Sequence, residues 1–249
     1  MIEIIPLTGL PEIRAGDDLT ALFLAALVAH DLRSGDILVV TSKIVSKAEG
    51  RMIALSTIEP GAHARDIAAT IGKDPRLVEL VLRESSAVIR VAPGVLITRH
   101  RLGHVMANAG IDASNLGNDA QDRALLLPLD PDASAQAIAE GVAVRFGFAP
   151  AVIISDSFGR PWRMGVTNVA IGCAGIPSII DQRGKPDRDG RPMQVTQVAL
   201  ADLIAAAAGL AMGEGAEGIP AVLVRGLDLH GDPLPATALI RPLAEDLFT

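Results

Sequence analysis

Three acidic residues of this 249-residue chain stand in stretches rich in glycine, hydroxyl and amide side chains, a setting that suits hard cations. Asp156 lies between two serines, Asp112 lies in NAGIDASN at 108–115, and Glu214 lies in MGEGAEG at 212–218. A single Asp–Ser pair after a strand is most often only a helix cap or an Asx-turn. Three such acids together point to a carboxylate cage for Mg²⁺ or Mn²⁺, because both ions prefer oxygen ligands. We therefore predict that the three acids converge on one metal site.

Hydroxyl and ammonium groups follow a second apolar run, Ile37–Val40. Ser42 and Ser46 stand among Lys43 and Lys47, where the predicted strand gives way to a loop or a helix. Such donors suit phosphate oxygens through charge-assisted hydrogen bonds. The glycine-rich P-loop pattern is absent, so this segment is not a Walker A loop. The solvated start of a capped helix is an equally simple interpretation, and the residues by themselves leave both open.

Short apolar runs and amphipathic spacing predict the elements that must position these groups. The predicted strands are 3–6, 37–40, 95–99, 104–107, 151–154 and 221–224. The predicted helices begin at Leu19, cover 60–72, 75–90, 130–146 and 195–210, and include a short one in the tail. Both strands and helices are thus expected throughout the chain, which is consistent with a mixed α/β (α+β) fold.

The stretch 150–177 is expected to organise the fold. Its strand is predicted to end in an acid- and hydroxyl-bearing loop over 155–160, which turns at Gly-Arg-Pro. Arg160 and Arg163 add fixed positive charge on either side of the single tryptophan, Trp162. A rigid strand that leads into such a loop is suited to hold a hard cation and an anion together.

Composition excludes several classes of function. A net charge of −7 argues against a general nucleic-acid binder, which would carry a basic face. No apolar run approaches the roughly 18 residues that a membrane span requires. The single cysteine, Cys173, excludes an internal disulfide, and its small apolar neighbours predict a buried residue and not a nucleophile. A cytoplasmic protein with no nucleic-acid or membrane partner is the expectation.

The segment 181–193, DQRGKPDRDGRPM, is too polar for a core and is interrupted by glycine and proline. It predicts a mobile loop, either a lid over the site or an arm that reaches a partner. The residues do not decide between these two roles.

Four motifs give the chain a resemblance to a known family. They occur in the order GDILVVTSKIVSKAEGR, NAGIDASN, ISDSFGRPWRMGVTNVAIG and MGEGAEGIPAVLVRGL. The resemblance begins at PLTGLPEI near the start and ends at VRGL near the end, so it covers nearly the whole chain. Together these motifs resemble the coenzyme F420:L-glutamate ligases, also called gamma-glutamyl ligases.

The resemblance implies a mixed α/β fold of two closely packed subdomains with mixed sheets, assembled as a homodimer. Residues 1–249 are then one gamma-glutamyl ligase domain. Some relatives are fused to a further domain, and this chain resembles the stand-alone form. The implied activity uses GTP and a divalent metal to join L-glutamate to the deazaflavin coenzyme precursor F420-0. Further gamma-glutamyl links then extend the tail, and K⁺ is an additional candidate cation.

The resemblance also implies roles for individual residues. The implied metal ligands are Asp112, Asp156, Ser157 and Glu214, and Lys47 joins the three acids as a catalytic residue. The implied GTP contacts are Leu10, Pro11, Glu12, Ile13, Ser42, Lys43, Lys47, Asn115, Met212, Gly213, Glu214, Gly215, Ala216, Glu217, Gly218 and Ile219. Ser157 stands where some relatives have Thr and keeps the hydroxyl, whereas Phe158 departs from the Asn of some relatives. Arg160 and Arg163 are candidates to grip the phosphodiester or carboxylates of the substrate, or else form surface or dimer contacts.

An acyl-phosphate route fits these residues. Transfer of a gamma-phosphoryl group activates a carboxylate, and amide formation follows. Two other classes stay open at this point. A metal-dependent phosphoester hydrolase would use the same acids to direct water at a phosphoester. A non-catalytic deazaflavin- or nucleotide-binding protein would have little need for three acids on separate loops beside a phosphate site.

Overall fold

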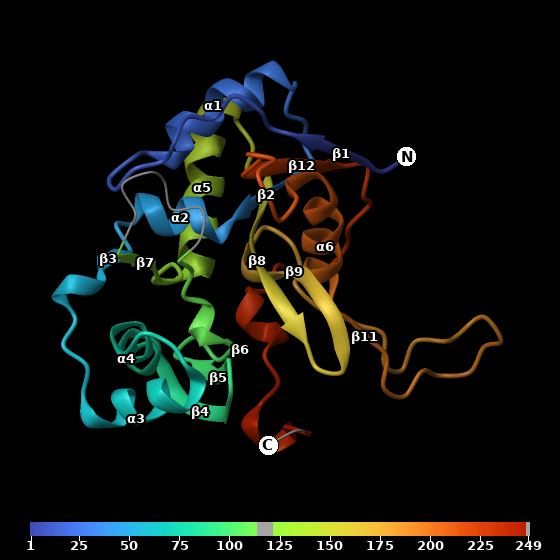
Figure 1. Cartoon of the computed structure of the whole chain (residues 1–249). Coiled ribbons are helices and arrows are strands. Elements are labelled where there is room, and N and C mark those ends of the chain that lie inside the picture. The colour runs from blue at the N-terminus through green and yellow to red at the C-terminus, as the bar shows by residue number, and fades with distance from the viewer. Residues whose placement is uncertain (114–121, 248–249) are drawn as a thin grey trace.

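The structure, a computed structural model, describes residues 1–113 and 122–247 of the chain (Figure 1). The strands are β1 (Glu3–Pro6), β2 (Ile37–Thr41), β3 (Met52–Ala54), β4 (Ser85–Ala92), β5 (Val95–His100), β6 (Val105–Ala107), β7 (Arg123–Leu125), β8 (Ala151–Arg160), β9 (Arg163–Ala174), β10 (Ile180–Asp181), β11 (Gln197–Val198) and β12 (Ala221–Arg225). The α-helices are α1 (Leu19–Ala29), α2 (Ser42–Ala48), α3 (Ala62–Ile71), α4 (Pro75–Arg83), α5 (Pro131–Phe146) and α6 (Leu200–Met212). Single 3₁₀ turns are η1 (Leu55–Thr57), η2 (Asn108–Gly110), η3 (Ala236–Leu239) and η4 (Leu243–Glu245). The prediction of a mixed α/β fold is confirmed.

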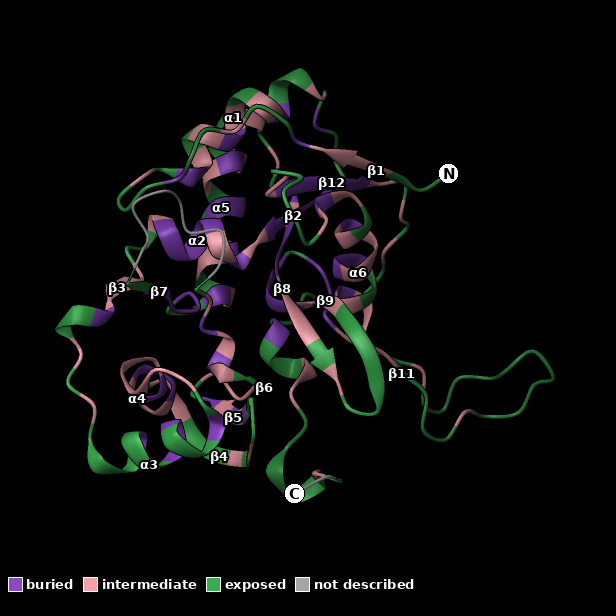
Figure 2. Cartoon of the chain, viewed as in Figure 1, coloured by how far each residue is buried: buried purple, intermediate pink, exposed green. Residues whose placement is uncertain are grey.

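A five-stranded mixed sheet forms the centre, in the order β1-β12-β2-β8-β9. Only β2 and β8 run parallel; the other neighbours are antiparallel. In β2, Leu38 and Val40 join the hydrophobic cluster beneath α1 and α5, whereas Ile37 and Val39 join the cluster beneath α6. Successive side chains of a strand point to opposite faces, so both faces of this sheet are covered. Figure 2 shows β2 and β12, at the middle of the sheet, buried.

Local sequence explains where the covering helices begin and end. The Asp130 carboxylate accepts a hydrogen bond from the backbone N–H of Ala133 and caps α5, which ends at Gly147 with a φ of 77°. The Asp18 carboxylate caps α1 through the N–H of Ala21. A side-chain acceptor at the first turn and a left-handed glycine at the last are common helix boundaries. The predicted start of each of these two helices is confirmed.

A smaller unit, α3 and α4 with the three-stranded sheet β4-β5-β6, has a hydrophobic cluster of its own. It lies below the central sheet in Figure 1, beyond the two-stranded sheet β3-β7. The two closely packed subdomains stay a prediction, as does a single ligase domain over residues 1–249.

Four local predictions are wrong. Residues 155–160 continue β8 as a strand because they pair with β9, a partner that local pattern does not reveal. Residues 85–90 are not helical, since α4 ends at Arg83 and the β-branched run that follows pairs with β5. The last predicted helix begins five residues later, at Leu200, because Gln197–Val198 pair with β10. The tail contains 3₁₀ turns in place of a regular short helix.

The segment 181–193 extends away from the rest of the chain as an exposed arm, drawn at the right of Figure 1. A bridge between Pro186 and Pro192 closes it on itself. Cys173 is buried in the cluster under α6, as predicted, and burial raises the pKa of its thiol to about 12. No helix in the described residues has the length and apolar character to cross a membrane.

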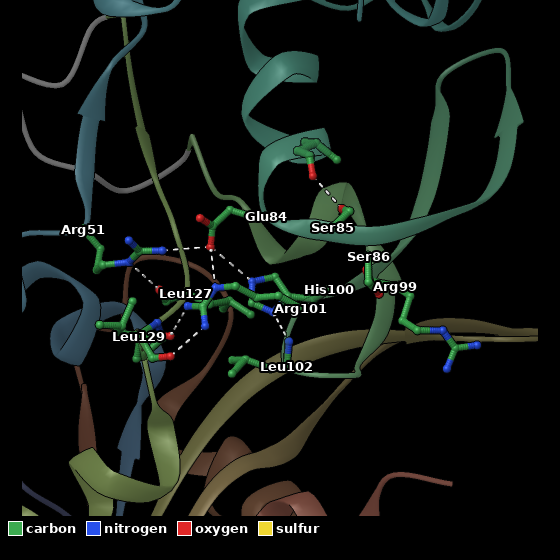
Figure 3. Close-up of polar contacts among 12 residues, drawn as sticks. Arg51, Glu84, Ser85, Ser86, Arg99, His100, Arg101, Leu102, Leu127 and Leu129 are labelled. Atoms are coloured by element: carbon green, nitrogen blue, oxygen red, sulfur yellow. Dashed lines mark hydrogen bonds and ion pairs between the residues drawn. The ribbon is translucent and has the colours of Figure 1, made fainter. Parts of the chain in front are cut away.

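A partly buried charged network around Glu84 joins the smaller unit to the segments that carry the candidate site (Figure 3). Arg51, just after α2, donates to Glu84 at 2.8 Å and to the carbonyl of Leu127 at 3.0 Å. Arg101 contacts the same carboxylate oxygen at 3.2 Å. The network therefore holds the end of α2 against the strand that leads to α5.

His100 and the two arginines lower the pKa of Glu84 to about 2, against an opposing effect of desolvation. The His100 Nε2 atom lies 3.4 Å from the Glu84 carboxylate, which is long for a hydrogen bond. The guanidinium groups are therefore the firmer part of this stabilisation. Removing the carboxylate charge would leave two half-buried guanidinium groups without their shared partner.

We expect Glu84→Gln to lower the free energy of unfolding by about 2–3 kcal/mol at neutral pH. A depressed pKa contributes stability above the unfolded value near 4.5, and this contribution is lost as the pH falls towards about 2. The deficit should therefore be full above pH 4.5 and shrink below it. Urea unfolding at several pH values measures this, with Glu140→Gln on the exposed face of α5 as the control. A deficit that is constant with pH would contradict the charge argument.

Candidate active site

A cavity of about 710 Å³ opens at the carboxyl end of β2, where its parallel pairing with β8 stops at Thr41 and Ser155. It is lined by the loop before α1, the start of α2, β6, the end of η2, β8, β9 and the loop after α6. Ligands of α/β proteins commonly bind beyond the carboxyl ends of parallel strands. The predicted site residues that line this cavity are Leu10, Pro11, Glu12, Ile13, Ser42, Lys43, Lys47, Asp112, Asp156, Ser157, Gly213, Glu214, Gly215, Ala216, Gly218 and Ile219.

The three predicted acids face this cavity from three separate elements. The Asp112 carboxylate pairs with the Lys43 ammonium at 2.7 Å. The Ser157 hydroxyl donates to Glu214 at 2.8 Å. Among the described residues, no group of three acidic, histidine or cysteine side chains is close enough to hold a metal ion as it stands. The structure thus brings the predicted acids to one cavity, and their role as metal ligands stays a prediction.

Asp156 lies at the base of the cavity, at the end of the buried part of β8. Burial raises the pKa of its carboxyl group to about 6, and the nearby Asp112 charge adds to this. The Ser42 hydroxyl, which donates to Asp156 at 3.0 Å, and the backbone N–H of Ser157 oppose the shift. A desolvated carboxylate next to another acid is favoured in its charged form by a bound cation.

The two lysines share one face of α2 because they are four residues apart. The Lys43 side chain is 29% exposed, and the Lys47 side chain is 9% exposed and pairs with Glu12 of the loop before α1. Lys47 is the more buried ammonium, and its ion pair with Glu12 offsets part of the cost of burying it. Both ammonium groups point positive charge into the cavity that the acids line.

The loop after α6 depends on glycine. Gly213 has φ 70° and ψ 179°, a region that is essentially limited to glycine. A Cβ atom there would lie 2.2 Å from the carboxyl carbon of Glu217. That carboxylate accepts a hydrogen bond from the N–H of Gly215 at 2.8 Å and shapes the loop that presents Glu214.

Several predicted contacts fall outside the cavity. Glu217 acts within its own loop, and Met212 is buried, with its sulfur 3.9 Å from the Ser155 hydroxyl. Arg160 donates to the carbonyl of Met164 at 2.9 Å, and Arg163 is exposed. Neither arginine lines the cavity.

Asn115, a predicted GTP contact, lies outside the described residues. Sequence reasoning also missed lining residues, of which Asn168 is the most polar. Asn168 is buried, lies opposite Ser157 in the β8–β9 pair, and packs its amide against Gly209 of α6. Its place depends on strand register, so no local signal identified it.

A mixed α/β scaffold that gathers carboxylates, hydroxyls and ammonium groups in one large cavity is suited to an enzyme that acts on small, charged molecules. Its catalytic groups come from loops and strand ends that a rigid sheet holds in place.

Comparison with known proteins identifies the family of enzymes to which this chain belongs. The profile of the F420-0:Gamma-glutamyl ligase family matches residues 9–226. The coenzyme F420:L-glutamate ligase of Methanothermobacter thermautotrophicus is 46% identical, over 99% of this chain and 98% of that protein. The protein of the same name from Methanopyrus kandleri is 44% identical over 99% of this chain and 96% of its own length. The one from Archaeoglobus fulgidus is 44% identical over 93% and 90%, respectively.

The chain therefore belongs to the F420-0:gamma-glutamyl ligase family, and it is a ligase. The resemblance stated from the four motifs is confirmed.

We expect Gly213→Ala to destabilise the loop after α6, because alanine at this backbone conformation costs about 1–3 kcal/mol and its Cβ would displace Glu217. Hydrogen exchange of the amides at 213–218 and the free energy of unfolding measure the effect. Gly184→Ala is the matched control, since Gly184 has a φ of 78° with open space around it. Equal losses of stability in both variants, with no change in exchange at 213–218, would contradict a role for the Glu217 contact.

Proposed function

We propose that this protein joins L-glutamate to the deazaflavin F420-0 by an amide bond, with GTP as the energy source, and then extends the gamma-glutamyl tail. The reaction serves coenzyme F420 biosynthesis. The observation that carries the proposal is that Ser42, Lys43 and Lys47 face the same cavity as Asp112, Asp156 and Glu214 in a member of this family. The names of the relatives state the acceptor coenzyme and L-glutamate as the partners of their reaction.

The chemistry takes two balanced steps. A carboxylate oxygen of the acceptor attacks the gamma-phosphorus of GTP, the bond to GDP breaks, and an acyl phosphate forms. The amine of glutamate then attacks the acyl carbon, inorganic phosphate leaves, and the amine loses a proton. Neither step needs covalent chemistry from the protein, so positioning and charge stabilisation supply most of the catalysis.

The residues of the cavity are suited to position the nucleotide and to stabilise its charge. The ammonium groups of Lys43 and Lys47 suit the phosphate oxygens, while Ser42 adds a hydroxyl. The loop at 10–13 and the loop after α6, apart from Glu217, line the remainder of the cavity that the nucleotide would occupy. Each lysine would exchange a carboxylate partner of this cavity for a phosphate of the nucleotide.

The donors also fit a hard divalent cation, since oxygen atoms of Asp112, Asp156, Ser157 and Glu214 face one cavity. Burial of Asp156 beside Asp112 is a like-charge arrangement that a cation relieves. Mg²⁺ or Mn²⁺, with K⁺ as a further cation, would neutralise charge on the phosphates when bound.

Mass spectrometry of the reaction tests the ligase. Purified protein with F420-0, L-glutamate, GTP and Mn²⁺ should give products heavier by whole glutamyl units. We expect Asp156→Asn and Lys47→Ala to lower the rate by about 10²-fold or more, and Val144→Ala on the exposed face of α5 to leave it unchanged. GTP consumption with unchanged deazaflavin would indicate a hydrolase. If neither GTP nor the deazaflavin is changed, the result would indicate a binding protein or another acceptor. Full activity of Lys47→Ala would overturn its phosphate role.

The proposal extends to a homodimer. The tip of the β8–β9 hairpin exposes Met164 at 97% and Trp162 at 84%, and Val195 at the base of the arm is 84% exposed. Figure 2 shows the β9 side of the hairpin and most of the arm exposed. Apolar groups on projecting segments are expected at interfaces between proteins, and a second copy of the chain is the proposed partner.

Light scattering after size-exclusion chromatography should give twice the mass of the chain. We expect Met164→Asp combined with Val195→Asp to shift the protein towards the monomer, because the added charges would be desolvated at the interface. Val144→Asp, an exposed apolar position on α5, should not. A monomer in the unsubstituted protein, or a dimer indifferent to the paired substitution, would contradict this interface.

A further inference from the structure

A second, smaller pocket of about 300 Å³ lies next to the main cavity, and Phe158 lines both. Its walls come from the turn before β6, the edge strand β9, α6 and the C-terminal segment. The C-terminal segment is held in place there: Ile240 packs so closely over Gly103 that a Cβ atom at that glycine would lie 2.9 Å from it. The pocket is therefore a built feature of the fold.

Apolar side chains form most of its wall, namely Val105, Phe158, Val169, Leu239 and Ile240. The ring of His104 meets the ring of Phe158 edge-on, with centroids 5.6 Å apart and an interplanar angle of 86°. Burial, and then the nearby His100, lowers the pKa of His104 to about 4, so this ring is neutral at pH 7. Two neutral aromatic rings and aliphatic groups suit a flat, uncharged ring system.

A few polar groups are set into this apolar wall. The Asp202 carboxylate of α6 accepts a hydrogen bond from the N–H of Ala170 at 2.9 Å. Within the described ranges, no basic side chain forms an ion pair with Asp202, although burial raises the pKa of its carboxyl group. Arg99 is fixed by Asp246 at 3.1 Å, and Arg241 lies at the same rim. A carboxylate acceptor and guanidinium donors in the wall of one pocket suit a ring edge that presents both N–H and C=O groups.

The position of Phe158 connects this pocket to the chemistry. Phe158 and Asp156 are two residues apart on β8, so their Cα atoms are about 7 Å apart. A short flexible chain can span that distance. The main cavity, with its lysines and about 710 Å³, is large enough to hold a nucleotide by itself.

We propose that the pocket beside Phe158 binds the planar ring system of the acceptor deazaflavin, with Asp202 accepting from its ring N–H, while the acceptor's side chain passes Phe158 towards Asp156. This assignment rests on the proposed ligase function. A guanine base is the competing occupant, because a carboxylate also recognises its N–H edge; the volume of the main cavity and the place of its lysines favour the deazaflavin.

Fluorescence titration with 5-deazariboflavin, which has the ring and ribityl chain but no phosphate, tests the pocket directly. We expect binding to the unsubstituted chain, and affinities about tenfold lower or worse in Asp202→Asn and Ile240→Trp. Asparagine keeps the acceptor for Ala170, and tryptophan at 240 fills the pocket. Asp66→Asn, exposed on α3, and Ile240→Val are the matched controls and should bind within about twofold of the unsubstituted chain.

Three results would overturn the assignment: no binding of the probe, unchanged binding in both pocket variants, or displacement of the probe by guanosine. Thermal unfolding checks that each variant is folded. In the ligase assay, Asp202→Asn should raise the KM for F420-0 while the KM for GTP stays constant. If the chain forms no amide, the proposed ligase function fails, and the titration still decides what the pocket binds. If the chain forms the amide but Asp202→Asn leaves the KM for F420-0 unchanged, only the pocket assignment fails.

Discussion

The parallel pairing of β2 with β8 is the contact on which the site depends. Its register sets Thr41, the last residue of β2, opposite Ser155, beyond which β8 continues paired with β9 alone. Ser42 and Asp156, the residues that follow this pair, both belong to the site, and the Ser42 hydroxyl donates to the Asp156 carboxylate at 3.0 Å. A slip of one residue would reverse which side chains of β8 face the cavity. Burial on both faces of the sheet opposes such a slip, because apolar residues alternate between two different clusters.

Two ion pairs neutralise part of the charge within the cavity. Lys43 holds Asp112 and Lys47 holds Glu12, while Asp156 has a hydroxyl and a backbone N–H. Under the proposed function, phosphates attract the lysines and release carboxylates that a cation can use. Binding of the anion and of the cation would then favour one another, because each relieves the charge that the other leaves unpaired.

Much of the fold could be predicted from local sequence. Asp130 and the glycine at 147 mark the ends of α5, and the short apolar runs identify β2 and β12. The candidate acids were recognised because their neighbours are unusual. The extension of β8 past residue 154 was missed, since its cause is the pairing with β9. Likewise, no local pattern places Asp202 and the tail residue Ile240 at one pocket, because those positions depend on long-range packing.

That extension of β8 explains how one hairpin can serve two pockets. A loop over 155–160 would let Asp156 and Phe158 move independently, whereas the ladder to Val169 and Thr167 fixes both. The distance between the reacting end of the acceptor and its ring would then be set by backbone hydrogen bonds and not by flexible side chains. Strand structure at this point is therefore part of how the site can position a long substrate, because catalysis by positioning requires that both ends be held at once.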